Sequence, residues 1–132
     1  PIILPLHPRT RARLTSLGRM IIERKGLRVI DPVGYLEMVV LERAAAVVVT
    51  DSGGVQKEAF FHGTPCVTLR NETEWVELVD LGWNRLVSPV SVDKIREAIL
   101  GSIGVHGREG RPYGDGAAAE EIAKILDRVM SS

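Results

Sequence analysis

Residues 50–59 read Thr-Asp-Ser-Gly-Gly-Val-Gln-Lys-Glu-Ala, and they follow directly after the apolar run 46–49. This order predicts a buried strand that ends in a turn of small residues, from which a helix begins. Free N–H groups and the positive dipole end at a helix start favour an anion by roughly 0.3–1 kcal/mol at an exposed site. Ser52 can cap the helix or place its hydroxyl on a phosphate oxygen, while Gly53 and Gly54 let a phosphate approach the backbone. The stretch therefore predicts a phosphate-binding turn.

A carboxylate stands close to this turn in the sequence. Glu58 lies one helical turn beyond Gly54. In that place it can accept hydrogen bonds from the two vicinal hydroxyls of a sugar. The alternative is an ordinary capped helix with Glu58 in solvent, and the local pattern does not distinguish the two.

The composition indicates one domain over residues 1–132, long enough to bury a hydrophobic core. Seventeen Lys and Arg balance seventeen Asp and Glu, which argues against nucleic acid or an anionic membrane as a partner. The lone Cys66 cannot form an internal disulfide, so a reducing cytoplasm fits, and we expect it to be buried. No apolar stretch reaches the ~18 residues of a membrane span. We therefore expect a cytoplasmic protein whose phosphate site is local.

Predicted strands alternate with predicted helices along the chain. Continuous rather than alternating apolar strands, separated by helices, predict a parallel sheet covered on both faces. The expected fold class is α/β, with a Rossmann-like doubly wound parallel sheet. Strands are predicted at 1–7, 27–30, 46–50, 65–69 and 84–87, and helices at 9–23, 35–43, 53–62, 74–81, 91–103 and 117–130, the last after a glycine-rich loop at 104–116.

The residues that follow these strands define a candidate site, because ligands of open parallel sheets bind beyond the carboxyl ends of the strands. They comprise donors for phosphate, apolar surface for a base and a carboxylate for ribose hydroxyls. These are the parts that a nucleoside diphosphate needs. The segments concerned are His7 with Arg9, 31–35, 52–58 and 70–75.

Three segments resemble the carboxy-terminal domain of the non-hydrolysing UDP-N-acetylglucosamine 2-epimerases: IDPVGYLEMV (30–39), TDSGGVQKEAFFHGTPCVTLRNETEWVELVDLGWNRLV (50–87) and PYGDG (112–116). Together with the segments between them they cover nearly the whole chain in the family's order and spacing. The resemblance implies a two-domain protein of the glycosyltransferase-B (GT-B) type, with UDP in the cleft. This chain then looks like the carboxy-terminal part of such a protein, without the amino-terminal domain.

The resemblance also implies roles for the residues of the glycine turn. Ser52, Gly53 and Gly54 match the positions that bind the diphosphate, and Glu58 matches the carboxylate that holds the ribose hydroxyls. Because a bound diphosphate needs neutralising donors, this assignment agrees with the turn predicted from the local pattern.

Other positions match the family only in part. Val33 and Met38 stand where well-known members flank the uracil with glutamine and phenylalanine. Arg70 matches the arginine of the R-D-x-T-E motif, where it either contacts substrate or makes a salt bridge near the hinge. Trp75 replaces a common arginine that faces the phosphates, and Lys57 replaces a common glutamate. Lys57 can point to solvent or restore positive charge near the phosphates, and of the two we expect it to face solvent.

The implied activity is inversion at C2 of the sugar, by elimination of UDP and its re-addition, which interconverts UDP-GlcNAc and UDP-ManNAc for cell-surface polysaccharides. The resemblance implies no cofactor and no metal, and a homodimer as the full-length protein. In the family the acids and bases come from the amino-terminal domain, so no catalytic residue is assigned here and the chain alone is expected to be inactive. The alternatives are a 2-epimerase of a UDP-diacetamido-uronic acid, a GT-B glycosyltransferase and a non-catalytic nucleotide-binding module.

Overall fold

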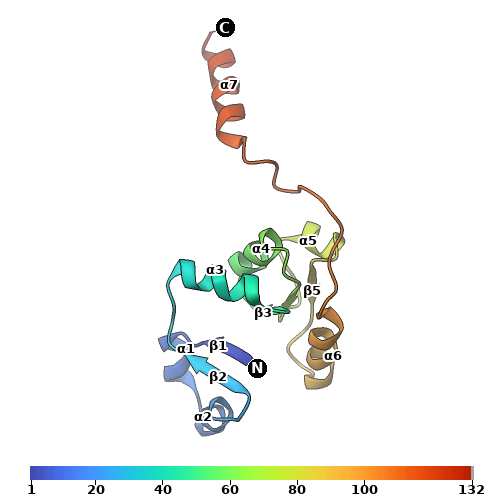
Figure 1. The fold of residues 1–132 in the computed structure, drawn as a ribbon. Helices are drawn as coiled ribbons and strands as arrows, with labels where there is room; N and C mark the ends of the chain where they lie inside the picture. The colour runs from blue at the N-terminus through green and yellow to red at the C-terminus, as the bar shows by residue number, and fades with distance from the viewer. Residues whose placement is uncertain (132) are drawn as a thin grey trace. The chain divides into compact units, whose positions relative to one another are not determined.

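The computed structural model describes residues 1–131 and divides into two compact units, Pro1–Leu41 and the residues from Glu42 onward (Figure 1). Each unit holds one sheet, and within the described residues every strand pairing is parallel. The predicted α/β class with parallel strands is therefore confirmed. The first unit contains β1 (Ile2–Pro5) and β2 (Leu27–Ile30), and the second contains β3 (Val48–Thr50), β4 (Cys66–Thr68) and β5 (Asn84–Leu86).

In the first unit, two short helices join β1 to β2, where the sequence predicted a single helix over 9–23. These are α1 (Pro8–Arg13) and α2 (Ser16–Ile22). Leu14 adopts an extended backbone, and the Thr15 hydroxyl accepts a hydrogen bond from the backbone N–H of Gly18 at 3.4 Å. Thr15 therefore begins a new helix. The apolar residues keep their helical spacing across this point, although the backbone helix is interrupted there.

The boundary between the units falls within α3 (Tyr35–Ala44). In the second unit, α4 (Gly53–Phe61) connects β3 to β4, and α5 (Val76–Asp80) connects β4 to β5. The central strand β4 is buried along its length, with Cys66 opposite Val48 on one side and Asn84 on the other. Ala59 of α4 packs onto Val48 and Cys66 to form the core of this unit. Burial raises the pKa of the Cys66 thiol to about 11, against the lowering effect of its hydrogen bond with Thr68.

Beyond the sheet lie α6 (Val92–Ser102), the loop 104–116 and α7 (Ala118–Met130). Ser91 caps α6, since its hydroxyl accepts a hydrogen bond from the Lys94 N–H at 3.4 Å. Asp115 accepts the N–H of Ala117, which is itself the N-cap residue of α7. No residue of α7 is buried, and its apolar stripe is exposed. In the described residues, no helix is both long and apolar enough to cross a membrane.

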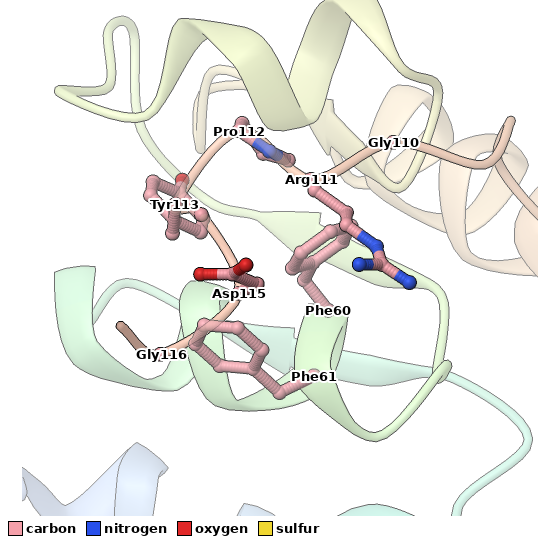
Figure 2. A pocket seen from close by; sticks show the side chains of 9 residues that line it. Phe60, Phe61, Gly110, Arg111, Pro112, Tyr113, Asp115 and Gly116 are labelled. Carbon is pink, nitrogen blue, oxygen red and sulfur yellow. The ribbon is translucent and has the colours of Figure 1, made fainter. Parts of the chain in front are cut away.

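The loop 104–116 lies against α4 and the turn after α5. Arg108 donates from its backbone N–H to the Leu81 carbonyl at 2.7 Å, and Trp83 Nε1 donates to the Arg108 carbonyl at 2.9 Å. Figure 2 shows a pocket of about 630 Å³ between the end of α4 and this loop, lined by Phe60, Phe61 and residues 110–116. It lies at the opposite end of α4 from the predicted phosphate turn.

Candidate functional site

The candidate site lies where the three parallel strands of the second unit end at one edge. Asp51 and Ser52 follow β3 directly, and Leu69 and Arg70 follow β4. The Leu69 N–H donates to the Thr50 carbonyl at 2.8 Å, which holds these two strand ends side by side. The topology thus brings Ser52 and Arg70 to the same edge, as predicted.

The glycine turn has the predicted form of a helix start. Ser52 is the N-cap residue of α4 in an extended conformation, and Gly53 and Gly54 form the first helical positions. The Ser52 side chain makes no capping hydrogen bond, and Ser52 is exposed. Its hydroxyl is therefore not committed to the helix, which leaves the ligand-binding interpretation of this residue open.

Glu58 lies half-buried on α4, near a second carboxyl group that the sequence analysis did not identify. Burial, together with the negative charge of Glu58, raises the pKa of Glu42 from 4.5 to about 7. Glu42 is only 2% exposed, and its Oε2 lies 3.6 Å from His62 Nε2. Glu58 therefore lies close to the deeply buried carboxyl group of Glu42. A Glu58 that pointed freely into solvent would have no such neighbour.

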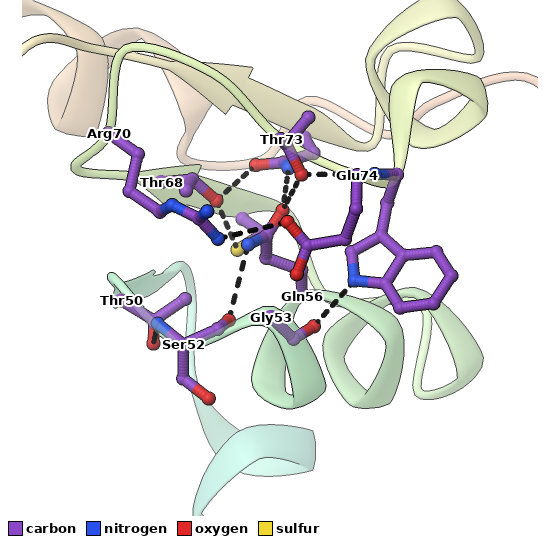
Figure 3. Close-up of polar contacts among 11 residues, drawn as sticks. Thr50, Ser52, Gly53, Gln56, Thr68, Arg70, Thr73 and Glu74 are labelled. Atoms are coloured by element: carbon purple, nitrogen blue, oxygen red, sulfur yellow. Dashed lines mark hydrogen bonds and ion pairs between the residues drawn. The ribbon is translucent and has the colours of Figure 1, made fainter.

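Arg70 is paired with Glu74 rather than free at the sheet edge. Its Nη1 lies 3.0 Å from Glu74 Oε2, and both side chains are partly exposed. The Glu74 carboxylate in turn lies against Gly53, where a Cβ atom would collide with it. The Trp75 indole N–H donates to the Gly53 carbonyl at 2.9 Å (Figure 3). Residues 70–75 therefore pack directly on the start of α4.

The expectation that Lys57 faces solvent is wrong. Its Nζ lies 4.4 Å from the centre of the Trp75 ring and 4.2 Å from that of Tyr113, and the two rings meet edge to face. An ammonium held between aromatic faces is attracted by their negative quadrupoles. Lys57 and Trp75, two of the departures from the family pattern, are thus direct neighbours in space.

Val33 and Met38 belong to the first unit, and the structure describes them there. Val33 precedes α3 and is half-buried, and Met38 lies within α3 with its N–H donating to the Gly34 carbonyl at 3.0 Å. Gly34 is fixed by a bond from its N–H to Glu37 Oε2 at 2.6 Å. Their predicted role beside a base stays a prediction.

A buried amide that the sequence analysis did not single out lies beneath the glycine turn. Gln56 is fully buried and bonds to Ser52, Thr73 and Asn84 (Figure 3). A polar residue at the fourth position of α4, on the side that carries Ala59, was the available signal. Among the described residues, no group of three or more His, Cys, Asp and Glu is placed to hold a metal ion.

Comparison with known proteins identifies the family. A family model described as UDP-N-acetylglucosamine 2-epimerase matches residues 1–127. The UDP-2,3-diacetamido-2,3-dideoxy-D-glucuronate 2-epimerase of Pseudomonas aeruginosa is 51% identical over 98% of this chain and 35% of its own length. The UDP-N-acetylglucosamine 2-epimerase of Methanocaldococcus jannaschii is 40% identical over 95% of this chain and 34% of its own.

Solved structures give the same result. The crystal structure of the Methanocaldococcus jannaschii enzyme in complex with UDP-GlcNAc and UDP superposes with a TM-score of 0.84 at 40% identity, covering 96% of this chain and 35% of that one. The Neisseria meningitidis enzyme bound to UDP-GlcNAc superposes with a TM-score of 0.66 at 27% identity, covering 96% of this chain and 36% of that one. This chain thus spans about a third of the length of these relatives. With the glycine turn, the parallel strands and these matches in agreement, the chain belongs to the UDP-N-acetylglucosamine 2-epimerase family.

Proposed function

We propose that this chain is the UDP-binding part of a UDP-sugar 2-epimerase. The observation that carries the proposal is the start of α4, where two glycines and an uncapped Ser52 hydroxyl follow a parallel strand at the ligand-binding edge of the sheet. A relative with a TM-score of 0.84 was crystallised with UDP-GlcNAc and UDP, which supports a nucleotide diphosphate as the ligand.

In this proposal the residues of the turn have separate tasks. Ser52, Gly53 and Gly54 bind the diphosphate through the hydroxyl and the backbone N–H groups. Glu58 accepts hydrogen bonds from the ribose hydroxyls. Its half-buried position on the second turn of α4 supports this role, because a carboxylate there is held by the helix rather than by a mobile loop.

Positive charge near the phosphates comes from two side chains. Arg70 lies at the strand edge beside Ser52 and is held there by Glu74. Lys57 places an ammonium over the Trp75 ring, so a positive charge is present beside the residue where many family members have an arginine. On the resemblance alone, we also propose Val33 and Met38 as apolar neighbours of the uracil.

The proposed reaction begins with elimination across C1 and C2 of the sugar. The bond from C1 to the UDP oxygen breaks, a proton leaves C2, and UDP and a proton then add back with the opposite configuration at C2. The donors of the glycine turn stabilise the charge that grows on the departing diphosphate. The acids and bases come from the remainder of the longer protein, so we expect this chain by itself to bind UDP and to show no turnover.

The 51% identity to a diacetamido-glucuronate 2-epimerase favours a second candidate for the sugar. A uronate carries one more negative charge than N-acetylglucosamine. Lys57, in place of a glutamate common in the family, removes a negative charge and adds a positive one, which agrees with a more negative substrate. Parallel assays of the longer protein with UDP-GlcNAc and with the UDP-diacetamido-uronate distinguish the two candidate substrates.

A cytoplasmic location and a dimeric enzyme belong to the same proposal.

The test is an NMR titration of the ¹⁵N-labelled chain with UDP, TDP and pyrophosphate, observing the amides of Gly53 and Gly54. We expect saturable shifts with UDP that exceed those with pyrophosphate and weaken in Glu58→Ala. Glu97→Ala, at an exposed position on α6, is the matched control and leaves the titration unchanged. No shift at millimolar UDP, or epimerase turnover by the 132-residue chain, would contradict the proposal.

A further inference from the structure

A chain of hydrogen bonds runs from the middle strand of the second unit to the glycine turn. The Thr68 hydroxyl donates to Asn84 Oδ1 at 2.8 Å, and Asn84 Nδ2 donates to Gln56 Oε1 at 2.8 Å. Gln56 Nε2 then donates to the Ser52 carbonyl at 3.2 Å. Thr68 and Gln56 are fully buried and Asn84 nearly so. Each side-chain amide in this hydrogen-bond network therefore has its partners inside the protein, as buried polar groups require.

The direction of these bonds is fixed by a group that can only accept. The Ser52 carbonyl oxygen can only accept, so the Gln56 side-chain atom that faces it at 3.2 Å is the amide nitrogen, and the amide oxygen faces Thr73 and Asn84. Thr73 then donates its hydroxyl proton to Gln56 Oε1 at 2.6 Å, while its oxygen accepts the backbone N–H of Trp75 at 3.1 Å. The orientation of the Gln56 amide follows from its neighbours alone.

This orientation matters for the turn because a peptide group is planar and trans. With the Ser52 carbonyl held towards Gln56, the N–H of Gly53 in the same peptide points the opposite way, out of the helix start. That is the direction in which a bound anion would lie. A rotated Ser52–Gly53 peptide would turn this donor away from the anion.

We propose that Gln56 is the positioning residue of the diphosphate site. It fixes the Ser52–Gly53 peptide from below, and through Thr73 it holds the 70–75 segment, with Arg70, against the same turn. Gln56 itself touches no ligand, since it is fully buried beneath the turn. The binding of a diphosphate at this turn rests on the proposed function. The effect of Gln56 on the Gly53 amide does not, because it is measured in the unliganded protein.

The informative variant is Gln56→Glu. Its carboxylate still accepts from Thr73 and Asn84, but when ionised it cannot donate to the Ser52 carbonyl, and when protonated it can. The matched control is Thr68→Val, which keeps the side-chain shape and removes a buried bond of the same network away from the turn. Both variants lose stability, so thermal unfolding is used to choose a temperature at which every protein is folded.

We expect the Gly53 amide of unliganded Gln56→Glu to shift at pH 8 and to return towards the wild-type position as the pH falls, while Thr68→Val leaves it in place. UDP affinity of Gln56→Glu should be about threefold to tenfold weaker than that of wild type at pH 8, and this ratio should shrink at lower pH. Thr68→Val should bind UDP within about twofold of wild type.

An unchanged Gly53 amide in folded Gln56→Glu would overturn the inference, as would equal shifts in Gln56→Glu and Thr68→Val. Failure of the wild type to bind UDP contradicts the proposed function instead, because the spectrum of the unliganded chain still decides what Gln56 does. Gln56→Met, which removes all three bonds at similar volume, should reproduce the Gly53 shift at every pH. A pH-dependent shift in Gln56→Met would also count against the role of the donated bond.

Discussion

The carboxylate of Glu74 lies directly against the Cα of Gly53, in the space that a Cβ atom at residue 53 would occupy. The same carboxylate holds Arg70 at 3.0 Å. Gly53, the first residue of α4, is therefore packed against the Arg70–Glu74 ion pair, which follows β4 in the chain. The glycine at position 53 is required by its neighbour and not by an unusual backbone angle, since its φ is not positive.

Gly53→Ala should displace Glu74, break its pairing with Arg70, and lower the free energy of unfolding by about 1 kcal/mol. Gly54→Ala is the matched control, because a Cβ there meets only Ser52 Oγ at 3.9 Å. It should be neutral or stabilising by up to about 1 kcal/mol, as alanine is the better helix former. Chemical denaturation measures both. In the Glu74→Ala background the cost of Gly53→Ala should largely disappear, and an undiminished cost there would refute the steric explanation.

The contact of Lys57 with Trp75 and Tyr113 can be tested through its charge. Lys57→Met keeps an unbranched side chain, one atom shorter, and removes the ammonium, so we expect a loss of about 0.5–1 kcal/mol of stability. Lys94→Met, at an exposed position on α6, should cost almost nothing. Denaturant unfolding followed by tryptophan fluorescence gives both values. Equal effects of the two substitutions would show that the aromatic contact contributes nothing beyond ordinary surface packing.

The buried Glu42 predicts a specific dependence of stability on pH. Its pKa is about 7 in the folded chain and near the ordinary 4.5 when unfolded, so the folded state binds the extra proton between these values. Stability should therefore fall as the pH rises from about 4.5 to about 7, with a total of roughly 1–3 kcal/mol from this group. Comparing wild type with Glu42→Gln across this window isolates the effect. Parallel pH profiles for the two proteins would contradict it.

The sequence predicted the strand Leu27–Ile30 residue for residue, and it predicted the turn from β3 into α4. Both depend on local signals, an apolar run bounded by glycine, proline or small polar residues. The break before α2 was missed because a capping threonine lay within a continuous helical spacing. Local sequence signals thus predicted the presence of helices and strands better than the residues at which they end.

The contacts around the site were harder to predict, because their partners lie far apart in the sequence. Lys57 looked like a solvated helix residue, and only the folded chain brings Tyr113 of the 104–116 loop onto it. Gln56 likewise finds Asn84 on β5. The turn itself could be predicted from the residue types that a phosphate site needs. The side chains that support the turn could be identified only in the folded structure.

Trp83 holds the 104–116 loop in place through its bond to the Arg108 carbonyl. A Cβ atom at residue 107 would lie 2.5 Å from Trp83 Cδ1, and the indole cannot move aside without losing its bond to the Arg108 carbonyl and its edge contact with Phe60. Gly107→Ala should therefore release the loop and speed trypsin cleavage after Arg108, on the order of tenfold.

Gly110→Ala is the control within the same loop, because the atoms it would meet are the flexible end of Leu81 at 3.0 Å. Its cleavage rate should stay close to that of the wild type. Trp83→Phe keeps an aromatic ring but removes the donor to Arg108, and it should fall between the two. If Gly107→Ala is cut no faster than Gly110→Ala, the loop is held by its other contacts, chiefly the 2.6 Å bond from Arg108 Nη2 to the Asp80 carbonyl.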